Sequence, residues 1–356
     1  MKIIITSPSL DTKTNVSGVS EITNFIIRGN PKHQYRHFRL GKTDNEKRGV
    51  LRIIRILFAW SKWFMLMISK SNILIHFNFA LDKRSSYRDL PLIILAQLLG
   101  KRMVIHLHGG EFLQEKKPSK FLQAALSKAL SGKEPKIVLS PLEKEIVEEK
   151  FNAVHVLVLP NSIDLTSAGN FSRNGQAGLS PKLLFIGRVD KNKGIEYIYQ
   201  ALNILKDKGV PFKFSMAGAG PEKDEYVQKF SASLNSHFEY KGVVSGKDKE
   251  DLFKESNIFL LPSMYEGLPI SLIETMSFGI VPVVTNVGSI GTLVKPGETG
   301  IFVNKHSARD IAESIEKLLN NQTLMGRLSK NAREIVFRDF NPVLYIEKLN
   351  EIYEKA

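Results

Sequence analysis

The feature that most constrains the fold of this 356-residue chain is a regular alternation of short apolar runs with longer amphipathic stretches. Between the runs of the first half lie candidate helices, such as 90–99 and 118–130. Continuous apolar strands that alternate with helices predict a parallel sheet covered on both faces. The runs of the first half, all rich in β-branched residues, are KIIIT (2–6), NILIHF (72–77), RMVIHLH (102–108), KIVL (136–139) and VHVLVL (154–159).

The alternation stops at TSAGNFSRNGQAGLSP (166–181) and then restarts. This stretch is rich in Ser, Gly and Asn and has no hydrophobic period, which is typical of a linker. A chain of this length usually exceeds a single core. We therefore predict two doubly wound α/β domains, with ligands bound in the cleft between them. The later runs are KLLFIG (182–187), FKFSMAG (212–218), FEYKG (238–242), IFLLP (258–262), IVPVVT (280–285) and TGIFV (299–303), with helices expected at about 194–208, 221–236, 248–255, 271–278 and 307–319.

Positive charge is concentrated in the first half of the chain. Residues 1–165 hold 26 Lys and Arg against 14 Asp and Glu, whereas residues 166–356 hold 24 against 22. Such an excess suits nucleic acid, anionic lipid or a phosphorylated ligand. The sequence contains no cysteine, which excludes disulfides and thiolate chemistry and suits a reducing cytoplasm.

The segment KRGVLRIIRILFAWSKWFMLMISK (47–70) combines positive charge with an apolar surface. Arg48, Arg52, Arg55 and Lys62 fall on one helical face, and the opposite side holds Ile, Leu, Phe, Trp and Met. Its uninterrupted apolar stretch is far shorter than the ~20 residues that span a bilayer. Two interpretations stay open: an interfacial helix lying on anionic lipid, and a buried helix of the N-terminal sheet with a solvated basic stripe. The surplus charge favours the first.

Several common motifs are missing from the sequence. GKT at 41–43 lacks the preceding glycine of a phosphate loop, and no complete G-x-G-x-x-G is present. There is no D-x-D, and no His, Asp or Glu cluster has metal-ligand spacing. These observations argue against a phosphate-loop protein, a dinucleotide-dependent dehydrogenase and a metal site.

Charged residues follow two of the predicted strands of the second half. Arg188 comes directly after 182–187, and Lys193 stands at the expected start of the next helix, where cations and helix amides converge on an anion. Alone, they would be read as solvated basic residues. Glu266 and Glu274 bracket an apolar segment, and carboxylates are rarely buried unless they are paired or functional.

Taken together, these motifs resemble the retaining nucleotide-sugar glycosyltransferases of family 4. The resemblance implies a GT-B fold, with two Rossmann-like doubly wound domains facing across a cleft. It also implies an acceptor-binding domain over 1–165, a linker over 166–181, a nucleotide-sugar-binding domain over 182–338 and a helix over 339–356 that crosses back to the first domain. The matching motifs are G-R-x4-K-G at 187–194, G-x-G-P at 218–221, Y-K-G at 240–242, E-G-x-P-x4-E at 266–274 and G-x-V-P-V-V at 279–284.

The resemblance implies roles for residues of the second half. Arg188 and Lys193 would bind the donor diphosphate and stabilise charge on the leaving nucleotide. Glu266 would face the sugar and the reacting centre, and Glu274 would accept hydrogen bonds from the ribose hydroxyls. The expected donor contacts of the backbone lie at Val243, Val244, Gly267, Leu268, Pro269, Ile270, Ser271 and Leu272.

The first half matches the family at fewer positions. Gly18 lies where the family keeps a glycine whose amide approaches the phosphates, although Ser17 replaces a second glycine. His108 ends a predicted strand before two glycines and corresponds to a histidine near the donor sugar and the acceptor; the alternative is a core histidine. Glu111 is a candidate acceptor contact.

The function that the resemblance implies is transfer of a hexose-type sugar from a nucleotide-sugar, expected to be a UDP-sugar, with retention of configuration. The acceptor would be a hydroxyl of a saccharide or lipid-linked saccharide in bacterial polysaccharide assembly. No metal, cofactor or nucleic acid is expected, and the protein would be cytoplasmic, peripheral on the inner face of the membrane through residues 47–70. Ser162 and Thr292 depart from the family pattern, and because of Thr292 the donor-sugar or base selectivity does not follow by analogy. The alternatives are a UDP-sugar epimerase of the same fold and a non-catalytic basic membrane-binding protein.

Overall fold

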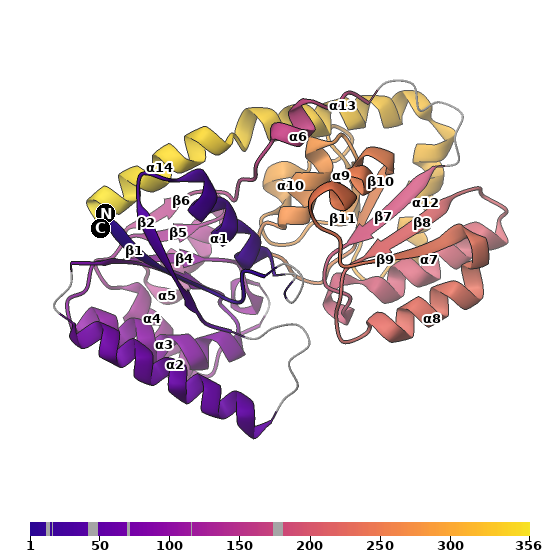
Figure 1. Ribbon diagram of the computed structural model, residues 1–356. Helices are drawn as coiled ribbons and strands as arrows, with labels where there is room; N and C mark the ends of the chain where they lie inside the picture. The colour runs from indigo at the N-terminus through magenta and orange to yellow at the C-terminus, as the bar shows by residue number, and fades with distance from the viewer. Residues whose placement is uncertain (12–14, 16, 42–48, 70–71, 115, 174–180) are drawn as a thin grey trace. The chain divides into compact units, whose positions relative to one another are not determined.

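The computed structural model describes residues 1–11, 15, 17–41, 49–69, 72–114, 116–173 and 181–356, with the backbone alone at 50–52. Residues 47–48 and 70 of the basic segment and residues 174–180 of the predicted linker lie outside this part. The chain divides into two compact units, Met1–Asn161 with Pro342–Ala356, and Ser162–Asn341. Each unit holds one six-stranded parallel sheet with flanking helices (Figure 1). The predicted α/β class with two doubly wound units is confirmed.

The N-terminal unit contains all five strands predicted for it and one that was missed. The additional strand, β2, lies at the edge of the sheet, and its sequence QYRHFR has no apolar run because it is partly exposed along its length. The strand order is β2-β1-β3-β4-β5-β6. The strands are β1 (Lys2–Ser7), β2 (Gln34–Arg39), β3 (Leu74–Phe79), β4 (Met103–Leu107), β5 (Lys136–Val138) and β6 (Val156–Val158).

Helices α2 to α5 cover one face of this sheet, each packed on the next, whereas α1 and α14 pack together on the other face (Figure 1). Helix α3 begins earlier than predicted, because the Asp82 side chain accepts hydrogen bonds from the Arg84 and Ser85 amides and caps it there. The elements are α1 (Gly18–Gly29), α2 (Val50–Ile68), α3 (Lys83–Leu98), the 3₁₀ turn η1 (Glu111–Leu113), α4 (Lys120–Leu130), α5 (Pro141–Phe151) and α14 (Pro342–Lys355).

One interpretation of residues 47–70 was a buried helix of the N-terminal sheet, and α2 is buried on one side only. Trp63 and Met67 are buried in the core, and the Trp63 ring makes edge contacts with Phe38 and Phe77. Its Nε1 donates to the Leu92 carbonyl at 3.1 Å. Most of the remaining large apolar side chains of this helix are exposed. The helix is therefore apolar on two sides, one packed and one open.

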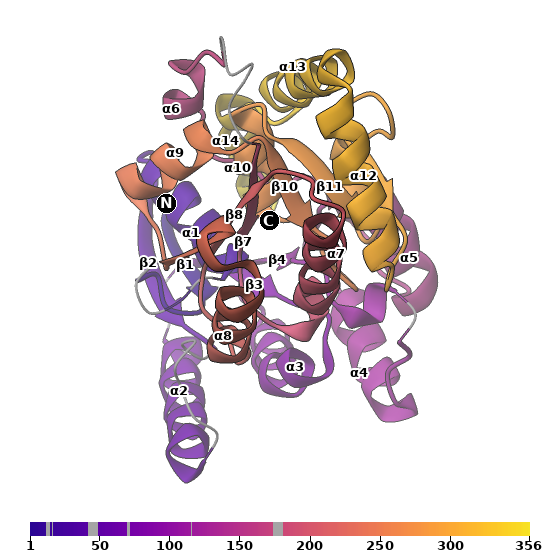
Figure 2. The same cartoon turned by 90° about the vertical axis from the view of Figure 1, so that its right-hand side faces the viewer.

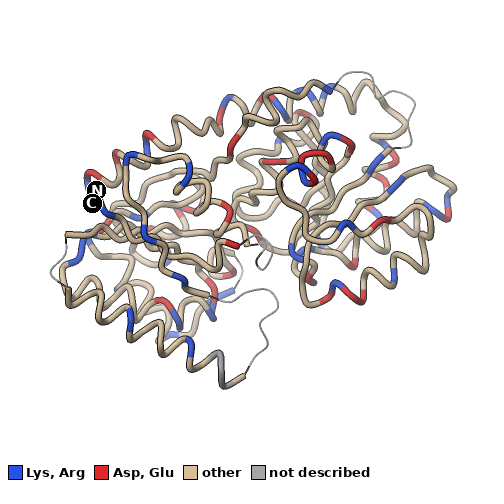
Figure 3. The backbone as a smooth tube through the Cα atoms, viewed as in Figure 1, with Lys and Arg blue, Asp and Glu red and all other residues tan. Residues whose placement is uncertain are grey.

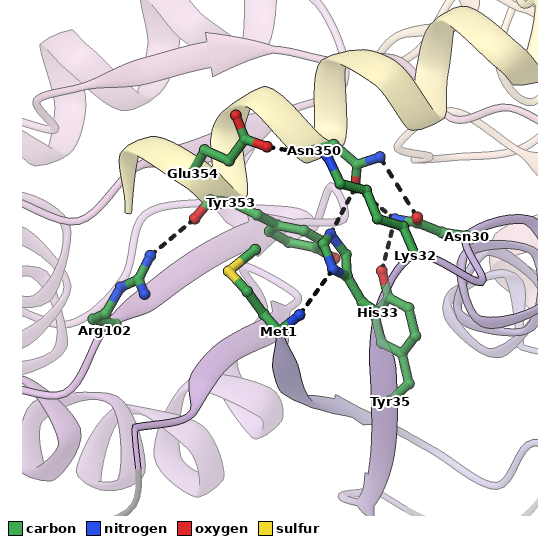
Figure 4. Close-up of polar contacts among 9 residues, drawn as sticks. All are labelled: Met1, Asn30, Lys32, His33, Tyr35, Arg102, Asn350, Tyr353 and Glu354. Atoms are coloured by element: carbon green, nitrogen blue, oxygen red, sulfur yellow. Dashed lines mark hydrogen bonds and ion pairs between the residues drawn. The ribbon is translucent and has the colours of Figure 1, made fainter.

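The C-terminal helix α14 completes the N-terminal unit (Figure 4). Asn350 contacts Asn30 at 2.7 Å and His33 at 2.9 Å, and Arg102 donates to the carbonyls of Ala356 and Tyr353. These contacts join the last turns of the chain to residues that lie 251 to 320 positions earlier, close to the starts of β2 and β4.

The C-terminal unit contains the six predicted strands in the order β12-β11-β10-β7-β8-β9, all parallel. Helices α7, α8 and α12 pack together on one face, and α10 and α13 pack together on the other (Figure 2). The strands are β7 (Lys182–Ile186), β8 (Lys213–Ala217), β9 (Phe238–Gly242), β10 (Ile258–Leu261), β11 (Val281–Thr285) and β12 (Ile301–Val303). The longer helices are α7 (Ile195–Asp207), α8 (Lys223–Leu234), α9 (Gly246–Glu255), α10 (Ile270–Ser277), α12 (Ala308–Asn320) and α13 (Gln322–Asp339).

The predicted linker differs from the structure at its start. Its first four residues form a single helical turn, α6 (Thr166–Gly169), which the Asp164 side chain initiates by accepting from the Thr166 amide and hydroxyl. Asp164 therefore supports the turn that leads into this unit. The Ser and Gly content of 166–181 masked this local helix signal.

Candidate functional site

The C-terminal sheet has a reversal of strand order between β7 and β10. These two strands are neighbours, yet β8 and β9 follow on the side of β7 and β11 and β12 follow on the side of β10. In open parallel sheets, ligands bind outside the carboxyl ends of the strands at such a reversal. Arg188 and Lys193 follow β7, and Glu266 follows β10. Three of the predicted catalytic residues thus come from the loops at this point.

Lys193 and Glu266 form an ion pair across the reversal. The Lys193 Nζ lies 2.6 Å from Oε1 of Glu266, and the Ser263 hydroxyl donates to the same oxygen at 2.7 Å. The Glu266 side chain is 8% exposed and that of Lys193 is 25% exposed. A cation and a carboxylate are therefore held together, largely shielded from water, at the edge where a ligand is expected. Ser263 was not predicted, because a serine after a strand carries no signal of its own.

Backbone contacts hold the two loops in place. The Met264 amide donates to the Asn192 carbonyl at 2.7 Å, and the Thr285 hydroxyl donates to the Ser263 carbonyl at 2.5 Å. Gly194 has a φ of 72°, and a Cβ there would lie 2.2 Å from the Pro262 carbonyl oxygen. The loop after β7 can approach the end of β10 this closely only because residue 194 is glycine.

Arg188 follows Gly187 directly at the end of β7. Burial lowers the pKa of its guanidinium, while Asp190 and Tyr265 raise it by their charge. An arginine remains a cation under such a shift, because its reference pKa is above 12. The C-terminal unit therefore offers a second partly buried cation beside Lys193.

Glu274 lies on α10 and is paired with a residue that the sequence analysis did not single out. The Lys249 Nζ, on α9, lies 2.6 Å from Oε1 of Glu274, and both side chains are less than one-fifth exposed. Lys249 orients the carboxylate. Nothing in a lysine at the start of an amphipathic helix distinguishes it from a solvated one, so only the structure could identify it.

The remaining predicted donor contacts of this unit lie on two loops. Val243 and Val244 connect β9 to α9, and Val243 is 37% exposed. Gly267, Leu268 and Pro269 lead into α10, which begins at Ile270 and continues through Ser271 and Leu272. The side chains of Leu268, Ile270 and Leu272 are buried, so only the backbone of this stretch is a candidate for ligand contact.

The N-terminal unit contains a polar network centred on Asn78 of β3. His108 Nε2 lies 2.7 Å from the Asn78 Oδ1, and His76 Nε2 lies 3.2 Å from the same oxygen. His76 Nε2 is also 3.2 Å from Nδ1 of His106, and His76 Nδ1 is 2.6 Å from the Tyr353 hydroxyl. His108, which directly follows β4, is thereby joined to the C-terminal helix α14.

The partners of Asn78 fix the direction of each hydrogen bond. Its Nδ2 donates to the Thr6 carbonyl at 2.7 Å and to the Thr23 hydroxyl at 3.1 Å, so its Oδ1 must accept. His108 and His76 therefore both carry their proton on Nε2. Tyr353 then donates to His76 Nδ1, and His108 presents an unprotonated Nδ1.

Burial keeps these imidazoles neutral. It lowers the pKa of His76 to about 4 and, together with the neighbouring His76, that of His108 to about 3. The pKa of His106 is lowered as well, by burial and by the charges that His108 and His76 would carry. His106 fits the core interpretation, since it is fully buried and its Nε2 has no hydrogen-bond partner among the described residues. His108 is half-buried and fits both.

Asn78, His76 and Tyr353 were not predicted. A usable signal was present, because His76 and Asn78 are two polar residues spaced two apart in an otherwise apolar strand and so share one face of the sheet. Tyr353 had no such signal, since its partner lies 277 positions earlier in the chain.

Gly18 and Glu111 are the remaining predicted site residues of the N-terminal unit. Gly18 is the first residue of α1 and is exposed, in line with a backbone amide that is open to a ligand. Glu111 begins η1 after Gly110, and Lys116 lies 2.6 Å from its Oε2. Burial raises the pKa of Glu111, but bonds from Lys116 and the Lys83 amide outweigh it and leave the pKa lowered.

The predicted site residues thus fall into a group of ion pairs in the C-terminal unit and, in the N-terminal unit, a neutral histidine network with the charged Glu111 outside it. Among the described residues, no group of three His, Asp or Glu side chains is arranged to hold a metal ion.

Comparison with known proteins finds a family match in the C-terminal unit. Residues 170–335 match the family model of glycosyl transferases group 1. The chain is 24% identical over 280 residues to alpha-D-kanosaminyltransferase of Streptomyces kanamyceticus, which covers 74% of this chain and 72% of that protein. It is 25% identical over 280 residues to UDP-Gal:alpha-D-GlcNAc-diphosphoundecaprenol alpha-1,3-galactosyltransferase of Escherichia coli, with 73% and 71% covered.

Solved structures agree on the fold. Sucrose-phosphate synthase of Thermosynechococcus elongatus superposes with a TM-score of 0.78 at 18% identity, over 99% of this chain and 98% of that one. HepE of Anabaena, in complex with UDP and glucose, superposes with a TM-score of 0.74 at 15% identity over the whole of both chains. Both support the predicted GT-B fold, and the comparisons favour neither the epimerase nor the non-catalytic alternative. The chain therefore has the GT-B fold, and its residues 170–335 match the family model of glycosyl transferases group 1.

Proposed function

We propose that this protein is a retaining, family 4 glycosyltransferase that moves a hexose-type sugar from a UDP-sugar to a hydroxyl group without a metal ion or cofactor. The observation that carries the proposal is the grouping of Arg188, Lys193 and Glu266 where strand order reverses in the C-terminal sheet. Partly buried cations at that edge suit a diphosphate. Transfer without a metal requires such cations, because a departing nucleoside diphosphate develops negative charge.

The pairing of Lys193 with Glu266 suggests how the donor would be received. A diphosphate that approached Lys193 would offer the ammonium a second anion, while the Ser263 hydroxyl would continue to hold the Glu266 carboxylate. Glu266 would then face the sugar. Glu274, oriented by Lys249, would accept hydrogen bonds from the ribose hydroxyls.

The transfer that we propose proceeds on one face of the sugar. The bond between the anomeric carbon and the phosphate oxygen breaks while the acceptor oxygen bonds to the same carbon. The proton of the acceptor hydroxyl passes to the departing phosphate oxygen, whose charge Arg188 and Lys193 stabilise. Configuration is then retained without a covalent enzyme intermediate.

His108 is the residue of the N-terminal unit that we assign to the sugar. Its neutral ring, with Nε2 bonded to Asn78, leaves Nδ1 as an acceptor for a sugar hydroxyl. Gly18 would offer its amide to phosphate, and Glu111 would contact the acceptor. An imidazole held neutral by burial keeps this acceptor role throughout the physiological pH range.

We propose a UDP-sugar as the donor because a relative is named for its use of a UDP-sugar and a structural neighbour was solved with UDP bound. The Escherichia coli relative uses UDP-Gal and a diphosphoundecaprenol-linked acceptor, and the HepE structure contains UDP and glucose. By the same reasoning we propose a saccharide or lipid-linked saccharide acceptor in bacterial polysaccharide assembly. A lipid-linked acceptor would place the protein in the cytoplasm, at the inner face of the cell membrane.

A thermal-shift panel with UDP, GDP, ADP and several UDP-sugars tests the donor site. A ligand at about 100 times its Kd adds ~2.7 kcal/mol of stability, which raises the melting temperature by several degrees. We expect a UDP-selective shift in the wild type, loss of the shift in Glu274→Ala, and no loss in Glu255→Ala, which changes an exposed pair with Lys182. The absence of a shift with every nucleotide would contradict the proposal.

The epimerase alternative makes a different prediction with the same protein. Incubated with the UDP-sugar that gives the largest shift and no acceptor, an epimerase would produce a second UDP-sugar, which chromatography resolves. We expect the starting UDP-sugar to remain, apart from slow release of UDP, until a saccharide acceptor is added.

A further inference from the structure

An apolar surface stripe runs the length of α2 in the N-terminal unit. Seven large apolar side chains between Ile53 and Ile68 are 50–64% exposed. Their spacing of three, four and seven residues places them together on one side of the helix. They form two adjacent rows, with Ile53, Leu57, Phe64 and Ile68 in one and Ile54, Phe58 and Met65 in the other.

This stripe is distinct from the face that holds α2 to the unit. Trp63 and Met67 supply the buried contacts and point into the core of the N-terminal sheet. A surface helix normally alternates such a buried face with a polar one. Here the outward side is apolar as well, so the exposed rows need another partner.

The stripe continues into a groove between α2 and α3. The groove has a volume of about 400 Å³, and apart from Ser61 its lining side chains are apolar. Phe64 and Met65 belong to both the stripe and the groove, and Trp60 also lines the groove. Pro91 and Leu92 line the side of α3, where proline has no amide hydrogen to present. A chain of methylene groups fits such a lining.

The charge around the stripe has a single sign. From residue 50 to residue 81 the sequence has four Lys and Arg and no Asp or Glu, and Figure 3 shows no acidic segment on α2. Arg55 and Lys62 are two helical turns apart on the border between the stripe and the buried face, and the Lys62 Nζ lies 4.3 Å from the centre of the Phe58 ring.

The neighbouring helices α3 and α4 also carry a net positive charge. Asp89 is the acid within α3, and it is buried in a bidentate pair with Arg88 at 2.6 Å. Helix α4 has Lys120 and Lys128 and no acid. Asp82 is held by the amides at the start of α3, and further carboxylates lie in α5, with Glu145 among them.

We propose that the stripe and groove of α2 dock the N-terminal unit onto a bilayer that contains anionic phospholipid, with one lipid hydrocarbon chain lying in the groove. A bilayer surface supplies both complements, since acyl chains take the apolar rows and negative headgroups take the basic border. A second copy of this face would instead bring equal charges together. The inference deepens the proposed function, because it places the protein where a lipid-linked acceptor resides.

The geometry corresponds to a helix that lies in the membrane plane. Within the residues that the structure covers, no helix combines the length and the hydropathy needed to cross a bilayer. The C-terminal part of α2 is anchored in the core by Trp63 and Met67, so the exposed rows on its other side are the part that inserts. Trp60 lines the groove beside these rows and packs partly against the core.

The two tryptophans of the chain allow a direct test, because both lie on α2. Purified full-length protein is mixed with vesicles of phosphatidylcholine alone or with 30% phosphatidylglycerol, and with lipids brominated on their acyl chains. We expect co-sedimentation with the anionic vesicles only, weakened by salt, and quenching of tryptophan emission by the brominated chains. Trp60→Phe should remove most of the quenching, because Trp63 is buried in the core.

The variant Leu57→Glu/Met65→Glu separates docking from other causes. It should weaken partition onto anionic vesicles by at least about tenfold, since two carboxylates replace inserted side chains. Lys62→Gln should weaken it about fivefold through the loss of one charge. Val343→Glu, at a similarly exposed apolar residue on α14, should bind like the wild type.

The proposal would be overturned by three results. These are wild-type protein that fails to bind anionic vesicles, a double variant that binds as well as the wild type, or a wild-type dimer in light scattering that the double variant abolishes. The melting temperature and UDP shift of each variant show that it is folded. Vesicle binding without any nucleotide shift would leave this inference standing while contradicting the proposed function.

Discussion

The two six-stranded units organise their polar centres in opposite ways. In the C-terminal unit, ion pairs such as Lys193–Glu266 and Lys249–Glu274 join loops and helices that follow strands of the sheet. In the N-terminal unit, neutral imidazoles run from His108 through Asn78 and His76 to Tyr353, mostly inside the sheet. Charge is kept where a charged ligand is expected, and uncharged hydrogen bonds are kept where the polar groups are buried. The two units should therefore respond differently to the same perturbations.

The largest effect should come from the charged centre. Arg188→Ala and Lys193→Ala should each lower the rate of sugar transfer on the order of 10²–10³-fold, because each removes a cation from developing negative charge. Release of UDP from the donor identified by thermal shift, with a saccharide acceptor present, measures this. Lys191→Ala, two residues before Lys193 and exposed, is the matched control and should transfer at the wild-type rate. Equal rates in the wild type and all three variants would contradict a catalytic role for the charged centre.

A smaller effect is expected from removing one hydroxyl in the neutral centre. Tyr353→Phe leaves Nδ1 of the buried His76 without a donor, which should lower the free energy of unfolding by about 1–3 kcal/mol. The control is the tyrosine–histidine pair of the other unit, Tyr197 with His306 at 2.6 Å, which is exposed. Tyr197→Phe should change stability by less than half as much in urea titrations. If Tyr197→Phe lost more stability than Tyr353→Phe, the buried hydrogen bond would not be the more stabilising of the two.

The neutral centre should also make stability depend on pH. The pKa of His76 is about 4 in the folded protein, below its ordinary value of 6.5, so the unfolded chain binds more protons in between. Stability is then complete above pH 6.5 and falls as the pH drops toward 4, by up to about 1.4 kcal/mol per pH unit for each such histidine. Melting temperatures measured from pH 8 to pH 4.5 test this. His76→Gln should show a shallower fall than the wild type, and an identical slope would contradict the assignment.

The smallest effect is expected for a charge pair outside either centre. Lys182 and Glu255 are 2.7 Å apart, but both are well exposed, so Glu255→Gln should change stability by less than about 1 kcal/mol. Thermal melts at low and high salt would detect it. A loss of stability comparable to that of Tyr353→Phe would contradict this prediction, because an exposed ion pair would then stabilise the protein as much as a buried hydrogen bond.

The sequence was sufficient for most of the fold because the strands of parallel sheets are continuous apolar runs. Most strands had that signature, whereas the edge strands β2 and β9 interleave polar residues with aromatic ones, and β2 was missed. Helix α2 exposed a second limit. Its periodicity indicates a helix, yet apolar residues occupy both the packed side and the open side, and hydropathy alone does not separate the two.

The candidate site could be predicted only as far as local motifs extend. Lys193 and Glu266 each stand in a recognisable pattern after a strand, and adjacency of β7 and β10 brings them together. Lys249 and Tyr353 belong to no motif. They matter through partners that are distant in the sequence, and such pairing is a property of the folded chain alone.

The inclusion of α14 in the N-terminal unit has a consequence for how the chain is made. When residues 1–161 leave the ribosome, the hydroxyl that His76 requires is still a whole unit of sequence away. At about 5–20 residues per second, synthesis of the intervening unit occupies roughly 10–40 s. During that time the face of the first sheet that α14 will cover lacks that helix. The first unit to begin folding is therefore the last to be finished.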